Sequence, residues 1–202
     1  MIVAYRITPY DDDSFMLGDE TYRSASPPTY HDWRFGKDGV PHPATCPTCG
    51  RKIDPDYVNP EFRANHRNWD IGATYDGYDI VSKAFRDCCR GNDLQGITFV
   101  PLPADPDFFV VRLSQVLRFD AERRGTRFEK LCPSCGKHNS VAGATPVFLR
   151  DIKEPIAEGF FRTDVEFGSA HEQGPLMLVG VRTAELLRMQ RFRKCDLEAV
   201  HD

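Results

Sequence analysis

Two short cysteine motifs hold the residues of this chain that are best suited to chemistry. Cys46 and Cys49 lie in the sequence Cys-Pro-Thr-Cys-Gly, and Cys132 and Cys135 lie in Cys-Pro-Ser-Cys-Gly. A two-residue spacer lets one tight turn direct both sulfur atoms at the same ion, and four thiolates complete a tetrahedral Zn²⁺ site. A single Cys-x-x-Cys is also typical of redox sites, whereas two near-identical copies favour structural zinc. We therefore predict one zinc ion per chain, bound by these four cysteines.

The interval between the motifs distinguishes them from a compact zinc finger. We refer to residues 46–50 as the first knuckle and to residues 132–136 as the second knuckle. About 80 residues separate them, against about 15 to 20 in a compact four-cysteine ribbon. An interval of this length can hold packed structure of its own, so the metal would join distant parts of the chain. Four protein ligands leave no open coordination position, which predicts a structural role without catalysis.

Two histidines flank the knuckles and raise the question of further ligands. His42 precedes the first knuckle, and His138 follows the second. Either could replace a ligand or contact one from outside, because such outer groups tune metal thiolates. The alternative is a solvent-exposed histidine beside a turn. Four cysteines already fill a zinc site, so we favour the second interpretation.

The other three cysteines, Cys88, Cys89 and Cys195, fall at apolar positions of the pattern. Adjacent cysteines on one helix point about 100° apart and rarely form a disulfide without strain. We therefore expect reduced thiols that act as small hydrophobic side chains. The sequence contains no glycine-rich phosphate loop and no recognisable nucleophile arrangement. We expect a protein that is not an enzyme.

Composition and charge narrow the class of protein further. The chain has 202 residues, of which 41% are hydrophobic and 28% charged, as in a globular protein, and its net charge is −4. A negative balance argues against nucleic acid as a partner, since phosphate binding needs basic surface. No apolar N-terminal segment resembles a signal peptide, and the longest aliphatic stretch, residues 176–179, is too short to cross a bilayer. With free thiols, these features predict a cytoplasmic protein with no membrane partner.

Residues 78–102 have the clearest local pattern. Ile80 and Val81 are apolar, Ser82 can cap a helix, and Phe85 and Cys89 recur at helical spacing. An apolar run at residues 97–100 then predicts a strand. The segment therefore reads as strand, helix and strand.

Residues 176–200 repeat this order, with a helix that Thr183 can cap. A constant shift superposes Ile80 on Leu178 and Cys89 on Leu187. Alternation over residues 159–167 predicts a further strand with one apolar face. We therefore expect a single strand-rich α+β domain over residues 1–202. In it, a discontinuous zinc ribbon clasps two strand–helix–strand units, 78–102 and 176–200.

The two knuckles, together with the strand, helix and strand at residues 176–200, resemble the double-CXXCG-motif proteins, a bacterial group of the myxobacterial type. Some members are regarded as immunity proteins encoded beside polymorphic toxins. The resemblance implies a protein that binds and neutralises a cognate toxin. Only the four knuckle cysteines carry over residue by residue, and the family offers no catalytic motif.

Residues 54–79 combine acidic and aromatic side chains, which we interpret as a candidate partner surface. Acidic groups steer a basic partner, and Trp and Tyr are common interface anchors. A toxin that cuts nucleic acid would be basic. The alternative is a solvated loop whose aromatic side chains pack on the core. The candidate partner-binding residues are Asp54, Asp56, Tyr57, Glu61, Trp69, Asp70, Tyr75 and Asp76.

These observations favour a zinc-binding immunity protein that neutralises a cognate bacterial toxin. The alternative is a nucleic-acid-binding zinc-ribbon regulatory protein, for which the basic run 188–194 could contact phosphates and Phe192 could stack on a base. A third hypothesis is an enzyme that uses the free thiols.

Overall fold

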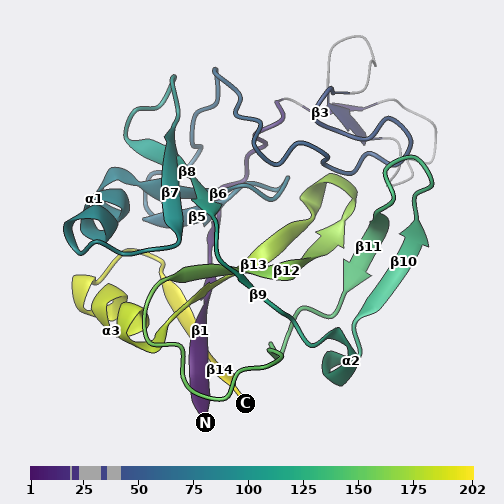
Figure 1. Ribbon diagram of the computed structural model, residues 1–202. Helices are drawn as coiled ribbons and strands as arrows, with labels where there is room; N and C mark the ends of the chain where they lie inside the picture. Colours follow the sequence, from purple (N-terminus) through teal and green to yellow (C-terminus); the bar gives the residue numbers. More distant parts are fainter. Residues whose placement is uncertain (19, 23–32, 36–41) are drawn as a thin grey trace.

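Two β-sheets form the body of the computed structural model, which describes residues 1–18, 20–22, 33–35 and 42–202 (Figure 1). The larger sheet curves across the molecule, and β9 (Val116–Leu117) pairs with it in parallel, beside β12. In spatial order its other strands are β10 (Arg127–Leu131), β11 (His138–Ala142), β12 (Phe160–Ser169), β13 (Gly174–Val179), β1 (Ile2–Thr8) and β14 (Asp196–His201).

The smaller sheet lies above the β12–β13 hairpin in the view of Figure 1. In spatial order its strands are β2 (Tyr10–Asp11), β5 (Ile71–Ala73), β6 (Asp79–Ser82), β8 (Phe108–Leu113) and β7 (Ile97–Pro101). A separate hairpin pairs β3 (Glu20–Tyr22) with β4 (Trp33–Phe35). The helices of the described ranges are α1 (Lys83–Gly91), α2 (Ala121–Arg124), α3 (Val181–Gln190) and the 3₁₀ turn η2 (Ala170–Glu172). The expected strand-rich α+β class is confirmed.

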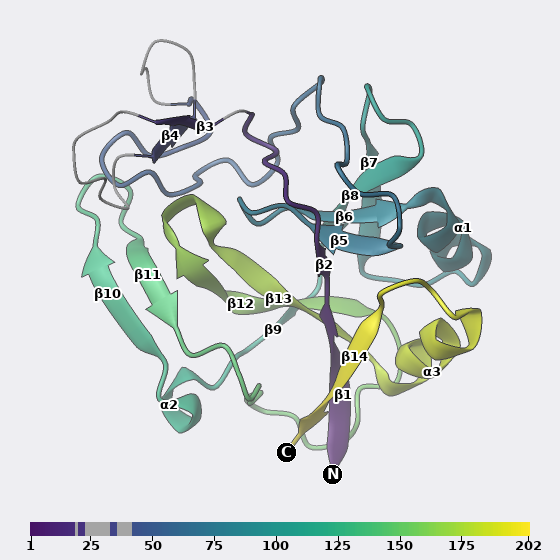
Figure 2. The same cartoon turned by 180° about the vertical axis from the view of Figure 1, so that it is seen from behind.

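The segments 78–102 and 176–200 have the same local topology. In the first, β6 and β7 are joined by α1 and both pair antiparallel with β8, which lies between them. In the second, β13 and β14 are joined by α3 and both pair antiparallel with β1. Figure 2 shows β1 and β14 side by side, with α3 next to α1. Each segment is therefore a split β–α–β unit whose central strand comes from elsewhere in the chain.

The two helices begin differently from each other. At α1 the Ser82 hydroxyl accepts a hydrogen bond from the Phe85 amide at 3.2 Å, as the sequence predicts. At α3 the predicted cap, Thr183, is wrong: the helix begins after Gly180. The Thr183 hydroxyl instead accepts a hydrogen bond from the Gly159 amide at 2.9 Å, so it ties the helix to the chain that enters β12.

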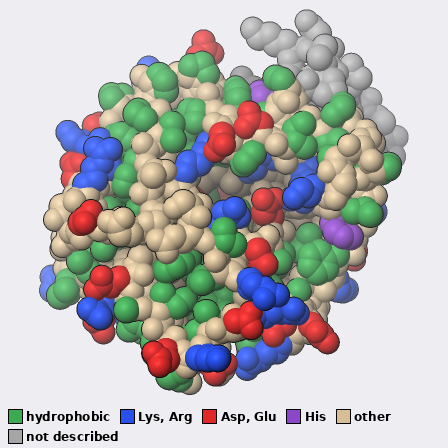
Figure 3. All heavy atoms as spheres, in the orientation of Figure 1, with side chains coloured by type: hydrophobic (Ala, Val, Ile, Leu, Met, Phe, Trp, Pro, Cys, Tyr) green, Lys and Arg blue, Asp and Glu red, His purple; other side chains and the backbone are tan. Residues whose placement is uncertain are grey.

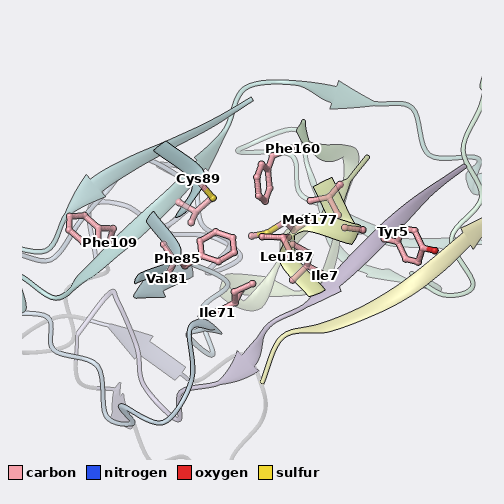
Figure 4. Packing of buried hydrophobic residues seen from close by; sticks show 13 residues of the cluster. Tyr5, Ile7, Ile71, Val81, Phe85, Cys89, Phe109, Phe160, Met177 and Leu187 are labelled. Carbon is pink, nitrogen blue, oxygen red and sulfur yellow. The ribbon is translucent and has the colours of Figure 1, made fainter. Parts of the chain in front are cut away.

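The two split units share one hydrophobic core. Phe85 from α1, Phe160 from β12 and Leu187 from α3 point toward one another in Figure 4, and all three are almost completely buried. The rings of Phe85 and Phe160 have centroids 6.0 Å apart and meet edge to face. Cys89 is buried in this cluster, as predicted, whereas Cys195 packs at its edge. Because both sheets contribute to it, neither unit buries its apolar face alone.

A second core lies under the other face of the smaller sheet. Trp69, Tyr78 and Ile80 are its centre, and each is at most 2% exposed. A third cluster, with Phe119 and Phe167, fills the curve of the larger sheet. No described helix is long and apolar enough to cross a membrane.

Candidate metal centre

The two knuckles meet in space despite the long interval between them. The Sγ atoms of Cys46 and Cys132 are 4.0 Å apart, and those of Cys49 and Cys135 are 3.7 Å apart. All four sulfur atoms lie within 4.8 Å of one another. Four sulfur ligands at about 2.3 Å from a tetrahedral Zn²⁺ would be about 3.8 Å apart. The cluster therefore fits a single tetrahedral metal ion such as zinc.

The backbone has the same form in both knuckles. The Cys46 amide donates a hydrogen bond to the Arg51 carbonyl at 2.7 Å, and the Cys132 amide donates to the Lys137 carbonyl at 2.9 Å. The glycines that end the knuckles have φ of 73° and 67°, a left-handed conformation that glycine adopts without steric cost. The Thr48 and Ser134 hydroxyls, one from each knuckle, are 2.7 Å apart. The knuckles thus form a matched pair around the sulfur atoms.

The balance between burial and amide hydrogen bonds divides the thiols into two kinds. The Cys135 amide donates to the sulfur of Cys132 and lowers the pKa of that thiol to about 6. Burial raises the pKa of Cys46, but amide hydrogen bonds, that of Cys49 first, outweigh burial and place it below its ordinary value. Burial raises the pKa of Cys49 to about 12 and also raises that of Cys135. Because zinc binds thiolates, metal binding must release the protons held by the second cysteine of each knuckle.

Arg51 anchors the first knuckle to the larger sheet. Its side chain is buried and donates to the His138 carbonyl at 2.7 Å, to the Gln173 side chain and to the Glu166 carboxylate. The Gln173 amide also donates to the His138 carbonyl, at 3.1 Å. These bonds connect the first knuckle to the strand that leaves the second. Sequence reasoning missed Arg51, because a lone arginine after a knuckle carries no pattern.

Neither flanking histidine belongs to the sulfur cluster. His42 is buried, accepts a hydrogen bond from the Ala44 amide at 3.0 Å, and meets the Tyr57 ring with centroids 4.7 Å apart. The expectation of an exposed side chain at this position is therefore wrong. His138 is half-buried, and its ring lies 5.3 Å from that of Phe128. Within the part of the chain that the structure describes, the metal-binding cluster consists of cysteines alone.

Three members of the candidate partner surface are buried, so the prediction of an exposed surface is wrong for them. Trp69 is 0% exposed, and its indole N–H donates to the Asp12 carboxylate at 3.1 Å. Asp76 is also 0% exposed and accepts hydrogen bonds from the Met16 amide at 3.0 Å and from the next amide along the chain. Asp70 is 5% exposed. These three side chains stabilise the segment 54–79 through buried contacts and are not available to a partner.

The other members lie at or near the surface. Asp56 is 81% exposed at its side chain and forms an ion pair with Arg112, at 3.0 Å. The Tyr75 hydroxyl donates to the Asp13 carboxylate. Tyr57 is half-buried against His42. The part of the candidate surface that remains is therefore Asp54, Asp56, Tyr57, Glu61 and Tyr75.

Asp70 connects the two split units. Its carboxylate accepts hydrogen bonds from the Arg193 amide at 2.8 Å and from the Ser82 hydroxyl at 2.7 Å. The Arg193 guanidinium adds a contact at 3.1 Å. Burial raises the pKa of Asp70, but the hydrogen bonds from Arg193 and Ser82 outweigh it and hold the pKa below its ordinary value. The folded protein therefore favours the charged form.

A carboxyl group whose pKa is lowered by folding adds stability above its unfolded pKa and loses it as the pH falls through the folded pKa. We predict that Asp70→Asn lowers the free energy of unfolding at neutral pH by about 1 to 3 kcal/mol. The difference from the unmodified protein should shrink as the pH falls below about 4. Urea denaturation across this range measures both quantities. The exposed Asp107→Asn variant is the control, and a pH-independent difference for Asp70→Asn would contradict the prediction.

Basic side chains of the run 188–194 make contacts within the protein. The Arg188 guanidinium lies 4.2 Å from the centroid of the Tyr5 ring, and the Lys194 ammonium lies 3.4 Å from that of Tyr10. Arg193 pairs with Asp70, as described above. The nucleic-acid alternative therefore gains no support from this run.

Comparison with known proteins identifies no related family or curated protein. A scan against protein-family models finds no match, and a search of curated proteins finds none either. Membership of the double-CXXCG-motif group thus stays a prediction that rests on the knuckles and on residues 176–200. The four-cysteine centre stands independently of it, on the geometry of the sulfur atoms.

Proposed function

We propose that this protein is a zinc-stabilised immunity protein that binds and neutralises a cognate toxin and has no catalytic activity of its own. The observation that carries the proposal is the closed four-cysteine centre. Protein sulfur atoms supply all the ligands that a tetrahedral zinc ion takes, so substrate has no coordination position. The metal then stabilises the fold, and the protein surface that the fold presents binds the partner. The family resemblance supplies the class of partner.

The exposed acids after the first knuckle are the best candidates for that surface. Asp54, Asp56 and Glu61 are exposed, and they follow the knuckle within one loop segment. Lys52 fixes the start of this segment, because its ammonium donates to the Asp76 carbonyl at 2.6 Å and lies 4.1 Å from the centroid of the Tyr78 ring. Acidic groups held in this way attract a basic partner and speed its association.

Co-expression with the product of the adjacent gene tests the proposal. We expect protection of the cells from that product's toxicity and a one-to-one complex on purification. If neither protection nor binding occurs, the proposal fails. Zinc content and thermal unfolding of the purified protein should be measured in parallel, so that a failure to fold is recognised.

A charge variant locates the surface. Neutralising Asp54, Asp56 and Glu61 together, as Asn, Asn and Gln, should weaken toxin binding about tenfold or more, chiefly through slower association. Unchanged affinity would exclude this segment as the interface while leaving the co-expression result to decide the function. A matched control neutralises three exposed acids elsewhere: Glu122→Gln, Asp151→Asn and Glu185→Gln.

A further inference from the structure

A pocket of about 590 Å³ opens beside the metal centre. Its walls come from the exits of both knuckles, from β6 and β8 of the smaller sheet, and from β12 of the larger sheet. Charged side chains of both signs are mixed around the centre of the face where the two sheets meet (Figure 3). A volume of this size is typical of sites that hold a small molecule.

The charges in the wall do not cancel. Three of the basic side chains in the wall have partners: Arg51 is paired with Glu166, Arg112 is paired with Asp56, and Lys52 donates to the backbone carbonyls of Asp76 and Gly77. The two remaining basic side chains of the wall are Arg162 and Lys137. The Arg162 guanidinium contacts the Thr163 carbonyl at 3.4 Å, and no carboxylate of a described residue forms an ion pair with Arg162 or Lys137.

The third wall acid, Asp79, interacts electrostatically with Lys52 and Arg112, and not with Arg162 or Lys137. Asp79 is half-buried, forms no ion pair among the described residues, and has a pKa that burial raises to about 6. The wall thus holds five basic side chains against three acids, and Arg162 and Lys137 are the two basic side chains without an acidic partner among the described residues. The local balance favours an anion as the occupant.

The same pocket also has an apolar side. Ile53 is 50% exposed, which is high for a side chain of its kind, and it lies in the wall together with Leu113 and Pro175. Ligand pockets commonly combine apolar walls with a few polar groups that fix orientation. A ligand that satisfies both parts carries an acidic group and an apolar body.

We propose that this pocket binds a small organic anion, whose acidic group is held by Arg162 and Lys137 and whose apolar part lies against Ile53 and Leu113. The site depends on the metal centre, because the residues that follow both knuckles form part of its wall. It does not depend on toxin binding. A protein with no toxin partner could still hold this ligand, and the two proposals can fail separately.

Phenyl phosphate is a suitable probe. Two compounds each represent one half of it: inorganic phosphate supplies the anionic group, and neutral benzyl alcohol supplies the aromatic part. Isothermal titration calorimetry on the zinc-loaded protein should show that phenyl phosphate binds more tightly than either half. Arg162→Gln should weaken its binding about tenfold, the usual value of one charge-assisted hydrogen bond. Arg162→Lys should retain part of the affinity, since it keeps the charge.

Arg182→Gln is the matched control, because Arg182 is an exposed arginine on α3 that pairs with Glu158 away from the pocket. It should leave the affinity unchanged. Zinc content and thermal unfolding, measured for every variant, show that the fold is intact. The proposal is overturned if phenyl phosphate does not bind, if benzyl alcohol binds equally well, or if folded Arg162→Gln binds as the unmodified protein does.

Discussion

Replacing Cys46 with serine is expected to abolish zinc binding and to lower the free energy of unfolding by about 4 to 5 kcal/mol, the value for losing a cross-link that closes a loop of this length. Serine is a poor zinc ligand, and three thiolates leave the site open. Because a structural metal binds the folded chain only, its binding free energy is also folding free energy. Small domains are stable by only about 5 to 15 kcal/mol, so the variant should be close to unfolding.

Elemental analysis and urea denaturation measure this effect. A strong chelator should destabilise the unmodified protein to a similar extent and leave Cys46→Ser unchanged. Cys88→Ser is the control, since Cys88 is a half-buried thiol far from the sulfur cluster, and it should retain the metal. Full zinc content in folded Cys46→Ser would remove this cysteine from the ligand set.

Asp12→Ala is expected to be the most damaging substitution outside the metal centre. The Asp12 carboxylate is 0% exposed and accepts hydrogen bonds from the Ser14 hydroxyl at 2.7 Å, the Asn65 amide at 3.0 Å, the His66 amide at 2.9 Å and the Trp69 indole at 3.1 Å. Alanine leaves several of these donors buried without an acceptor, at about 1 to 3 kcal/mol each. We predict a loss of about 3 to 5 kcal/mol in the free energy of unfolding.

Urea denaturation followed by tryptophan fluorescence reports this loss directly, because Trp69 is one of the donors. Asp12→Asn should have a smaller effect, since one oxygen can still accept. The neighbouring Asp13→Ala is the matched comparison: its carboxylate is exposed and contacts Tyr75 and His66 at the surface, so a smaller loss than for Asp12→Ala is expected. Equal stabilities of Asp12→Ala and Asp13→Ala would show that the buried hydrogen bonds do not hold residues 64–69.

Local signals predicted the features that depend on a few neighbouring residues. The knuckles follow from the cysteine spacing and the glycine after each pair, and the meeting of all four sulfur atoms agrees with that reading. The start of α1 follows from Ser82, whose hydroxyl caps the helix in the structure. Such features can be read from a sequence because their causes lie within one turn of chain.

Features that depend on tertiary contacts could not be read in this way. The sequence of residues 54–79 shows acids and aromatics but not which side chains lie inside, because Asp76 and Trp69 owe their burial to partners in residues 12–17. Arg51 is similar, since its partners lie in β11 and β12 and just before β13. Thr183 looks like a cap by its type, but its hydroxyl serves Gly159 instead.

The two split units differ in where their central strands come from, and this sets an order of assembly. The unit around α1 receives β8 from the next segment, so residues 79–113 contain all of its strands. The unit around α3 needs β1, at residues 2–8, to pair with residues 174–201. Closing a long loop costs more chain entropy than closing a short one, so the first unit can form earlier. During synthesis β1 leaves the ribosome long before its neighbours β13 and β14. Until these strands are made, the unpaired edges of β1 can pair with other chains and promote aggregation.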